Sequence, residues 1–576
     1  MHSKRENAGS SNKLLNKVTE KFHGVLTLTQ NIIVTAAIPY ANADLHIGHL
    51  RSTYIPADVY TRYLRLKGQN VIYICATDEH GTPISLRAEK EGITPKEIAD
   101  KYNKTIHEDL IKVGCSFDNF SRTTTQLHHE QTQRFFRCLL EKNYIYRDKY
   151  EQLFCPKCDR FLPDRYVEGV CPHCGGEKAR GDSCDVCGRY LKPTELKKPY
   201  CVSCGTTPEI RKTEHWFFKL SEFQDFLKEW LEENRDFPSN VRNYALEWLR
   251  EGLRDWCITR DLNWGVPVPI EDSKGKVIYV WFDAPIGYIS SSIEWANRVG
   301  DSEEWVSFWQ KEDSKIVHFI GKDIIYHHAI FWPAMLKGHG DYTLPYKIIA
   351  GEYLTLEGKK MSKSREWVIG VKDYLEKFEP DPLRYYLIAV SPLTKDADFS
   401  WAEFIRKNND ELADILGNFI HRTLTFTYRF FNKRIPNAEE LDEADERILE
   451  TIINVKHEVE ALLEKQEFHR AIRSIMGLAA TGNRYFNGQE PWKTVKEDPK
   501  KAANTLYISN QIVKALTILL EPFLPFTAER MWDLLNLPGS IHEQKWGEID
   551  VTLASHHVIK KPEPLFRKIE STTQLL

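Results

Sequence analysis

Four C-x-x-C pairs lie close together in the chain, and they constrain its fold more than any other feature of the sequence. The pairs are Cys155 with Cys158, Cys171 with Cys174, Cys184 with Cys187, and Cys201 with Cys204. The two inner pairs are separated by nine residues, and each is followed by glycine, as a tight knuckle around a tetrahedral thiolate site requires. The outer pairs flank this unit and can close a second four-thiolate site around it. We therefore expect two zinc ions, both structural, because protein thiolates fill every ligand position.

The other cysteines and the N-terminal residues indicate a cytoplasmic protein. Of the 12 cysteines, Cys75, Cys115, Cys138 and Cys257 are scattered singly, which argues against a disulfide framework. Residues 1–30 are polar and lack the apolar core of a secretory signal, and no apolar run of about 18 residues occurs. We expect a soluble protein without a membrane-spanning helix, whose residues 1–30 form a disordered extension.

Strands and helices alternate on both sides of the cysteine segment. Residues 31–38 form a near-continuous apolar run ended by Pro39, which is typical of a buried parallel strand. Residues 46–66 carry apolar side chains at helical spacing, and residues 71–76 predict a second strand. After the cysteines we expect strands at residues 276–281 and 315–320 and a helix at residues 324–336. The cysteine segment therefore interrupts one α/β domain.

Beyond about residue 400 the pattern is helical only. Two apolar stripes mark the first helices, one formed by Leu412, Ile415, Leu416, Phe419, Ile420 and Leu424, the other by Ile448, Ile452, Val455, Val459 and Leu462. Further helices are expected at residues 499–521 and 527–535. The C-terminal part is thus predicted to be a helical bundle.

The charge balance excludes a protein that binds nucleic acid through bulk positive charge. The 576 residues include 78 Lys and Arg against 82 Asp and Glu, a formal net charge of −4. Any nucleic-acid contact must be local, and residues 415–434 offer one, because they contain no acidic residue. Their basic residues are His421, Arg422, Arg429, Lys433 and Arg434.

Two separated segments could handle phosphate groups. The HIGH segment (His46, Ile47, Gly48 and His49) stands where the first strand passes into a helix, so a phosphate there would meet free backbone N–H groups and two imidazoles. The KMSKS loop (residues 360–364) follows Gly358 and Lys359, and its ammonium groups could balance a triphosphate. Taken singly, each has a plain alternative, namely solvated histidines at a helix start and a solvated charge run.

Taken together, the two segments are the paired signatures of class I aminoacyl-tRNA synthetases. Residues 37–42 (AIPYAN), 76–83 (ATDEHGTP), 281–288 (WFDAPIGY) and 319–323 (FIGKD) further resemble the methionyl-tRNA synthetase family. The resemblance spans about residues 31–570, and the doubled cysteine knuckles resemble members with two zinc sites. It implies a Rossmann-like parallel-sheet catalytic domain in two halves (residues 31–145 and 216–345) around a zinc-binding connective insertion (146–215). Three parts would follow: a region with the KMSKS loop that contacts the tRNA stem (346–400), an all-α anticodon-binding bundle (401–560) and a tail (561–576).

The reaction that this resemblance implies is attack of the methionine carboxylate on the α-phosphorus of ATP, followed by transfer of methionine to the terminal ribose of its tRNA. Such a displacement needs positioning and neutralisation of phosphate charge, by side chains and by Mg²⁺ carried with ATP. The expected catalytic residues are His46, His49, Lys360 and Lys363. Gly48, Gly321 and Asp323 would join His46, His49 and Lys363 in binding ATP, with Gly321 and Asp323 near the ribose.

The same resemblance implies the methionine site. Asp78 would hold the ammonium group, and the remaining residues would form the slot for the thioether, where aromatic rings offer favourable sulfur contacts. These residues are Ile38, Tyr40, Trp281, Ala284, Pro285, Tyr288, Ile324, His328 and Trp332. Ile38 stands where relatives often have leucine, and His327 stands where many have an aromatic ring. For the aromatic residues, plain core packing is the alternative.

The resemblance also implies how the tRNA is read. Asn418 and Arg422 are neighbours on one helix face, and Trp492 follows Pro491 in an expected turn, so the three could hydrogen-bond to and stack on unpaired anticodon bases. A solvated helix face with a packed tryptophan is the alternative. The sequence ends soon after a segment like the end of the family's helical domain. We expect a monomer, with a further tRNA-binding module, if any, on a separate protein.

Two other functions compete with this interpretation. Another class I synthetase, such as one for cysteine, would use an open zinc site to contact the substrate thiol, which four-thiolate sites do not provide. A zinc-ribbon RNA-binding scaffold without activity would not need His46, His49, Lys360 and Lys363. Turnover of ATP distinguishes the enzyme from the scaffold.

Overall fold

The computed structural model describes residues 30–181, 184, 186–187, 189, 191–273, 275–361 and 367–570. Its central element is a five-stranded parallel sheet in the order β14-β13-β1-β2-β3. The strands are β1 (Asn31–Ala36), β2 (Asn70–Thr77), β3 (Asn119–Arg122), β13 (Lys315–Gly321) and β14 (Lys347–Gly351). The strand order reverses beside β1, because β2 lies on one side of it and β13 on the other. In such sheets, ligands bind at the carboxyl ends of the strands beside this switch point.

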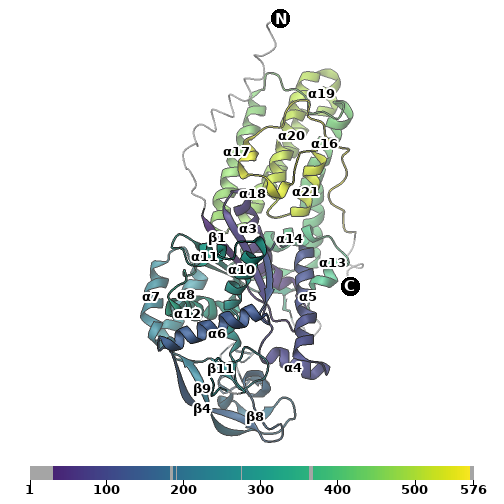
Figure 1. Cartoon of the computed structure of the whole chain (residues 1–576). Coiled ribbons are helices and arrows are strands. Elements are labelled where there is room, and N and C mark those ends of the chain that lie inside the picture. Colours follow the sequence, from purple (N-terminus) through teal and green to yellow (C-terminus); the bar gives the residue numbers. More distant parts are fainter. Residues whose placement is uncertain are drawn as a thin grey trace.

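Helices cover both faces of the sheet, as Figure 1 shows. They are α2 (Ile47–His49), η1 (Leu50–Tyr54), α3 (Ile55–Leu66), α4 (Thr82–Glu91), α5 (Pro95–Val113), α6 (Gln126–Glu141), α7 (Gln224–Glu233), α8 (Ser239–Glu251), α9 (Val280–Asp283), α10 (Ile286–Val299), α11 (Glu304–Trp309), η6 (His327–Phe331) and α12 (Trp332–His339). Side chains alternate along β1, so Ile32 and Val34 join the core with α3 and α5, whereas Ile33 joins the core with α6, α10 and α12. The sheet is therefore buried on both faces, as its apolar strands predict.

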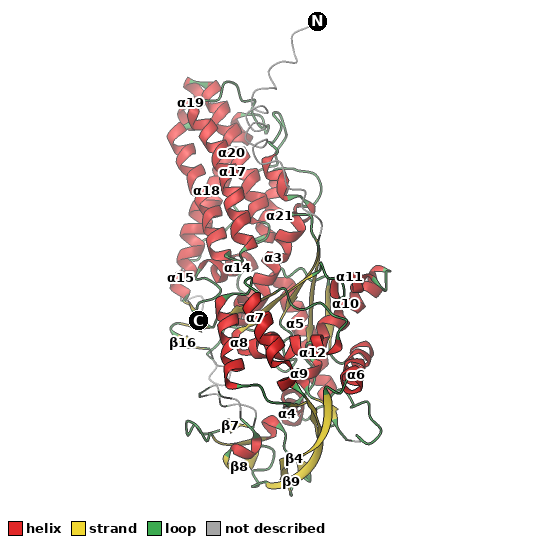
Figure 2. Ribbon diagram, turned by 90° about the vertical axis from the view of Figure 1, so that its left-hand side faces the viewer, coloured by secondary structure: helices red, strands yellow, loops and turns green. Residues whose placement is uncertain are grey.

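The cysteine segment projects from the sheet domain on a long antiparallel pair of strands, at the bottom of Figure 2. The pair consists of β4 (Ile145–Cys155) and β9 (Glu209–Phe218). Between them lie β5 (Arg160–Phe161), β6 (Val167–Val170), β7 (Ala179–Arg180) and β8 (Lys197–Cys201). A small core with Leu162, Tyr166 and Val167 packs around four of the cysteines. The predicted interruption of the α/β domain is confirmed.

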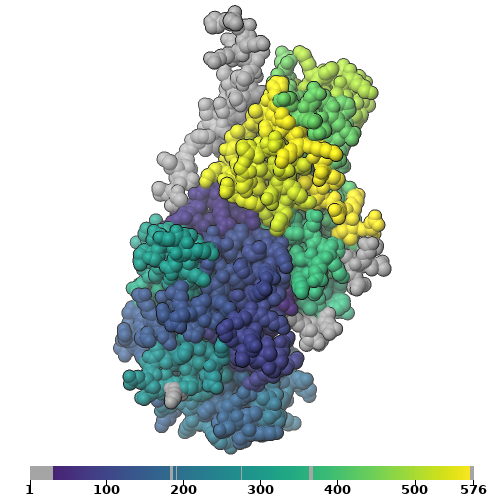
Figure 3. All heavy atoms as spheres, turned by 45° about the vertical axis from the view of Figure 1, so that its right-hand side comes forward, coloured from purple at the N-terminus to yellow at the C-terminus, as the bar shows by residue number. Residues whose placement is uncertain are grey.

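The C-terminal part is a helical bundle that lies over the sheet domain (Figures 1 and 3). Its elements are α15 (Trp401–Arg406), η8 (Lys407–Gly417), α16 (Asn418–Phe430), α17 (Glu443–Glu464), α18 (Phe468–Gln489), α19 (Pro491–Glu497), α20 (Pro499–Leu520) and α21 (Pro525–Leu534). The sequence analysis did not predict α18. Buried ion pairs join the bundle to the sheet domain. Arg62 of α3 pairs with Glu521, which follows α20, and with Asp58 of its own helix. Asp58 also pairs with Arg384. The bundle shares one hydrophobic core with a face of the sheet.

A connecting region links sheet and bundle. It contains β15 (Leu354–Leu356), β16 (Lys359–Lys360), β17 (Ala397–Phe399), α13 (Val371–Leu375) and α14 (Pro380–Ala389). β15 pairs with β16 in a hairpin and in parallel with β17. This hairpin leads directly into the KMSKS loop, most of which lies outside the described residues.

Two predicted elements differ from the structure. The strand expected at residues 276–281 is reduced to β12 (Val277–Ile278), which pairs with β11 (Thr259–Arg260) outside the main sheet, and α9 begins at Val280. A short apolar run does not encode its pairing partner, and here a local antiparallel pair forms instead. The helix expected at residues 324–336 begins with a 3₁₀ turn (Lys322–Ile324), continues through η6, and ends in α12 at His339. Within the part of the chain that the structure describes, no helix is long and apolar enough to cross a membrane.

Candidate active site and tRNA-facing residues

The HIGH segment begins a helix at the carboxyl end of β1. His46 is the extended N-cap residue, and its Nδ1 accepts a hydrogen bond from Gly48 N at 3.1 Å. His49 Nδ1 accepts from His46 N at 3.1 Å, and the two rings lie 3.8 Å apart between centroids. A nitrogen that accepts a hydrogen bond carries no proton, so each ring bears its proton on Nε2. Two Nε2–H donors therefore stand at a helix N-terminus, where anions are favoured.

The two signature segments touch each other, although they are far apart in sequence. A Cβ atom on Gly48 would lie 2.9 Å from the His46 ring and 3.0 Å from Met361 Cε, so only glycine leaves room for this packing. The chain after the loop is also tied to the HIGH segment, because Ile47 N donates to Ile369 O and Val371 N donates to Leu45 O. Residues 362–366, with the predicted Lys363, lie outside the described residues.

Lys360 and Asp323 both lie near one tyrosine, Tyr353. Asp323 follows Gly321 at the carboxyl end of β13, next to β1, and Gly321 has open space where a side chain would stand. The Tyr353 hydroxyl donates a hydrogen bond to Asp323 Oδ1. Lys360 Nζ lies 5.5 Å from the centroid of the same ring. Tyr353 was not predicted as a site residue, because its role depends on contacts between segments that no local pattern reveals.

Asp78 is buried at the end of β2. Its backbone is joined to the chain that follows β1, because Ala41 N donates to Asp78 O and Asp78 N donates to Pro39 O, both at 2.8 Å. Burial, followed by the nearby Asp283 carboxylate, raises the pKa of Asp78 well above its usual value. The two carboxylates are linked through His80, whose backbone N–H donates to Asp78 Oδ1 at 3.3 Å and whose Nδ1 lies 2.9 Å from Asp283 Oδ2.

His80 and Asp283 are thus additional candidates that the prediction did not include. Both side chains are almost fully buried, and burial lowers the pKa of His80 to about 4. His80 is therefore neutral near pH 7. The motifs around Asp78 and Trp281 contain both residues, so the sequence carried a signal for them, but only the fold shows that they meet.

Aromatic rings gather next to Asp78. Trp281 stacks on His327, with ring centroids 3.7 Å apart and planes 17° apart, and its edge faces Tyr40 at 6.2 Å. The Tyr288 hydroxyl lies 3.0 Å from His328 Nε2, and His328 Nδ1 lies 3.1 Å from Ile324 O. Because a carbonyl only accepts, His328 Nδ1 bears the proton and Nε2 accepts from Tyr288. Burial lowers the pKa of His328 to about 4, which keeps it neutral.

The remaining predicted pocket residues lie in the same region of the fold but differ in depth. Ile38 packs against Gly287, because a Cβ atom added to Gly287 would lie 2.9 Å from Ile38 Cδ1. Ala284 and Pro285 form the junction of α9 and α10. Trp332 is fully buried, and its ring neighbours Phe135 and Trp309 in the core. Trp332 is thus as deeply buried as Tyr288, and its part in the pocket stays a prediction from the sequence.

The eight knuckle cysteines form two groups of four, Cys155, Cys158, Cys201 and Cys204, and Cys171, Cys174, Cys184 and Cys187. The structure thus groups the outer pairs with each other and the inner pairs with each other, an arrangement that the sequence allowed but did not decide. The sulfur atoms of Cys155 and Cys204 lie 3.5 Å apart, and those of Cys171 and Cys187 lie 3.9 Å apart. Zn–S bonds of about 2.3 Å in a tetrahedron place sulfur atoms about 3.8 Å apart. Both groups fit a zinc ion.

The predicted anticodon residues meet at one end of the bundle. Arg422 Nη2 donates to Asn487 Oδ1 at 2.9 Å, and its guanidinium lies 4.8 Å from the Phe486 ring centroid and 5.7 Å from that of Trp492. Asn418 is exposed at the start of α16, and Trp492 is 39% exposed. Trp492 lies in the first turn of α19 rather than in an isolated turn, because Pro491 favours a helix start.

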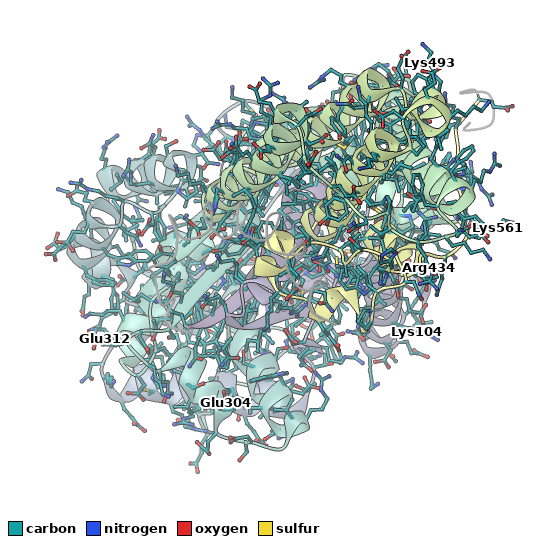
Figure 4. The ribbon with its side chains drawn as sticks, turned by 90° about the horizontal axis from the view of Figure 1, so that it is seen from above. Lys104, Glu304, Glu312, Arg434, Lys493 and Lys561 are labelled. Atoms are coloured by element: carbon teal, nitrogen blue, oxygen red, sulfur yellow. The ribbon has the colours of Figure 1, made fainter. Side chains whose placement is uncertain are left out.

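Three exposed basic residues lie on the side of the bundle. Seen from above, these are Arg434, Lys493 and Lys561, and Glu304 and Glu312 lie at the opposite side of the molecule (Figure 4).

The chain is similar to proteins of known activity along most of its length. A family model described as class I tRNA synthetases (M) matches residues 32–424, and one described as the anticodon-binding domain of methionyl tRNA ligase matches residues 435–574. The methionine–tRNA ligase of Methanopyrus kandleri is 53% identical over 541 residues, which cover 93% of this chain and 80% of that protein. That of Pyrococcus furiosus is 49% identical, over 93% of this chain and 75% of its own length. The structure of Mycobacterium tuberculosis methionyl-tRNA synthetase bound by methionyl-adenylate matches with a TM-score of 0.78 at 28% identity, covering 94% of this chain and 100% of the other.

Proposed function

The chain belongs to the methionyl-tRNA synthetases of class I, and on that premise we propose which of its residues activate methionine and charge the tRNA. The reaction joins methionine to its tRNA at the expense of ATP. A bond forms between the methionine carboxylate and the α-phosphorus while the bond to pyrophosphate breaks, and the adenylate then passes methionine to the terminal ribose. No side-chain nucleophile is needed, so the rate depends on the positioning of the substrates and on the neutralisation of phosphate charge.

The phosphates bind between the HIGH segment and the KMSKS loop. His46 and His49 donate from Nε2 to phosphate oxygens, a role supported by the hydrogen bonds that fix their Nδ1 atoms as acceptors. Lys360 and Lys363 neutralise the charge that develops on the leaving pyrophosphate. The contact of Met361 with Gly48 supports a common site for the two segments, and it is the observation that carries this proposal.

The adenosine ribose binds at the carboxyl end of β13. Asp323 accepts hydrogen bonds from ribose hydroxyls, and Gly321 leaves open space for a close approach. Mg²⁺ would come bound to the ATP phosphates and would offset part of their charge.

Methionine binds beside Asp78 among the aromatic rings. The ionised Asp78 carboxylate pairs with the substrate ammonium group. Tyr288 and His328 satisfy each other's hydrogen bonds, so the slot that they line with Trp281 and Tyr40 presents π faces rather than unpaired polar atoms. Such a surface suits an uncharged, polarizable thioether.

The zinc ions stabilise the insertion. The two groups of four cysteines would each hold one Zn²⁺ through thiolate ligands, and a zinc ion enclosed in this way supplies folding energy rather than chemistry. A closed site also disfavours the rival interpretation as a cysteine-specific enzyme.

The tRNA anticodon binds at the far end of the bundle. Arg422, held by Asn487 and two rings, is oriented for hydrogen bonds to bases, and the exposed Trp492 offers a stacking surface. Asn418 adds a second polar side chain on the same helix. A monomeric state, a separate tRNA-binding partner and a cytoplasmic compartment stay predictions from the sequence.

Amino-acid-dependent ATP–pyrophosphate exchange tests the proposal, with all twenty amino acids and with the variant Lys363→Ala. We expect exchange with methionine alone and a loss of about 10²-fold or more in kcat for the variant. Exchange with cysteine would overturn the methionine assignment, and no exchange by folded, zinc-loaded protein would favour the RNA-binding scaffold.

A further inference from the structure

Helix α18 carries positive charge along one exposed face. Its 22 residues include no Asp or Glu, and besides His469 its charged residues are Arg470, Arg473 and Arg484. The three arginines are exposed, and the exposed Gly477 lies between them at a helical spacing that keeps all four on one side. The neighbouring helix α17 is, by contrast, rich in Glu. A stripe of arginines thus runs along α18 in a chain whose net charge is −4.

A groove of about 420 Å³ lies between this face and α17. All three arginines line it, together with small residues such as Ser474 and Gly477. A Cβ atom on Gly477 would meet no described atom within 4 Å, so the space beside α18 is open here. Glu458 of α17 also lines the groove, where its carboxylate accepts a hydrogen bond from Ser474 Oγ at 2.7 Å. A partner can therefore approach the backbone of α18 closely.

Two of the three arginines keep their charge available for such a partner. Arg470 pairs with Glu467, which directly precedes α18. Arg484 Nη2 donates to the neutral Thr481 Oγ1 at 2.8 Å, and among the described residues neither Arg484 nor Arg473 forms an ion pair. A guanidinium offers five N–H donors and suits phosphate geometry. The chemistry of the groove therefore favours a phosphate-bearing partner.

The course of α18 indicates which phosphates these are. The helix begins at Phe468, whose ring lies 6.2 Å from that of Phe319 in β13 of the central sheet. Near its end, Asn487 accepts the hydrogen bond from Arg422 of the proposed anticodon site. Figure 1 shows α19, which follows α18, at the end of the bundle far from the sheet. The arginine stripe therefore runs from the anticodon site back toward the catalytic domain.

We propose that this stripe binds the phosphate backbone of the tRNA stem that carries the anticodon. A double-stranded RNA stem is bound mainly through its phosphates and 2′-hydroxyls, whereas its bases are read where they are unpaired. At a rise of 1.5 Å per residue, Arg473 and Arg484 lie about 16 Å apart along the helix axis, so they contact different phosphates. The inference rests on the proposed function, specifically on Arg422 and Trp492 as the anticodon site.

The variants Arg473→Gln and Arg484→Gln test the stripe by removing one charge each. Glutamine is nearly as good a helix former as arginine, so the unfolding temperature and methionine-dependent exchange should not change. The dissociation constant for the methionine tRNA is measured at several KCl concentrations. Each variant should weaken binding about three- to tenfold at low salt and reduce the slope of log K against log [KCl] by about 0.7–0.9. A purely structural arginine would leave this slope unchanged.

The matched control is Arg447→Gln, at another exposed arginine of the bundle. Arg447 pairs with Glu443 at 3.4 Å, and the exposed Glu450 lies one turn further along α17. Phosphates are not attracted to this acidic face, so both the dissociation constant and the slope should equal those of the wild type. Slopes that stay at the wild-type value in Arg473→Gln and Arg484→Gln would overturn the inference.

Altered RNAs separate the stem from the anticodon. With a tRNA whose anticodon bases are changed, the two α18 variants should lose the same factor as before, because phosphate contacts read no bases. A short hairpin of the anticodon stem and loop should show the loss in full. A loss confined to full-length tRNA, or an equal loss with heparin, would overturn the inference. Unchanged tRNA affinity in Arg422→Ala would instead count against the proposed anticodon site.

Discussion

Replacing Gly48 with alanine tests whether the contact between the two signature segments determines the rate. The new Cβ atom would lie 2.9 Å from Cε1 and Nδ1 of His46 and 3.0 Å from Met361 Cε. Ordinary contacts between carbon atoms are about 3.5–4.0 Å, so the overlap is at least about 0.5 Å. The His46 ring is also stacked on His49 and held by the Gly48 N–H, and relief must therefore displace the ring or the loop.

The expected magnitude follows from this displacement. A shift of about 1 Å in a positioning group costs about 10²-fold in rate, which corresponds to about 2.7 kcal/mol of activation free energy. The free energy of unfolding should not fall in parallel, because alanine favours a helix over glycine by about 0.8–1.0 kcal/mol. The variant should thus be folded and slow.

The assay is methionine-dependent exchange at varied ATP concentration, together with thermal unfolding. Gly477→Ala is the matched control, because Gly477 lies within α18 and a Cβ atom there would meet no atom within 4 Å. We expect the control to unfold at the wild-type temperature or slightly above it and to keep full activity. The reasoning is refuted if Gly48→Ala retains kcat/KM within threefold of the wild type, or if its loss of activity follows loss of folded protein.

Three further predictions concern the metal, the pH dependence and the tRNA. Cys155→Ser should retain one zinc ion per chain where the wild type holds two, as measured by elemental analysis, and should lower the unfolding temperature; unchanged zinc content would contradict the four-thiolate grouping. Because its pKa is raised, Asp78 takes up a proton at a higher pH than an ordinary aspartate, and a neutral carboxyl does not pair with ammonium. The KM for methionine should therefore rise on acidification from neutral pH. A KM that does not change with pH would exclude Asp78 as the ammonium partner. Arg422→Ala should raise the KM for tRNA about tenfold without changing exchange, whereas Arg447→Ala, at an exposed arginine of α17 paired with Glu443, should change neither.

The strands were predictable where burial on both faces makes them apolar throughout. β1, β2 and β13 follow from such runs, since their side chains meet helices on either side. Helix α18 was missed although its buried residues recur at helical spacing, because three glycines lower the helix propensity of this segment. One of these glycines is required by packing, since a Cβ atom on Gly482 would lie 2.5 Å from Phe419 Cζ. A residue chosen for a close helix contact thus weakened the local signal for the helix itself.

The candidate site was predictable only where motifs are contiguous. The HIGH segment, Asp78 and Trp281 each belong to a recognisable local sequence. Contacts between segments were not predictable: His80 and Asp283 belong to two of these motifs but meet across 203 positions of sequence, and Tyr353 contacts Asp323 from the segment between β14 and β15. Such pairs depend on strand order, which an isolated apolar run does not specify.

The position of the two signatures at one switch point explains why they should act as a unit. The chain beyond the KMSKS loop pairs with the HIGH segment, since His46 forms a bridge with Gly370 and Ile47 N donates to Ile369 O. Displacement of that chain therefore moves His46, which we propose binds the phosphates. The clash expected for Gly48→Ala is likewise shared by His46 and Met361, and shortening Met361 removes only the loop's part of it. When two residues are in such contact, the effects of mutating them on the activation free energy do not add. Mutations in the HIGH segment and in the KMSKS loop should therefore cost less in combination than the sum of their separate effects.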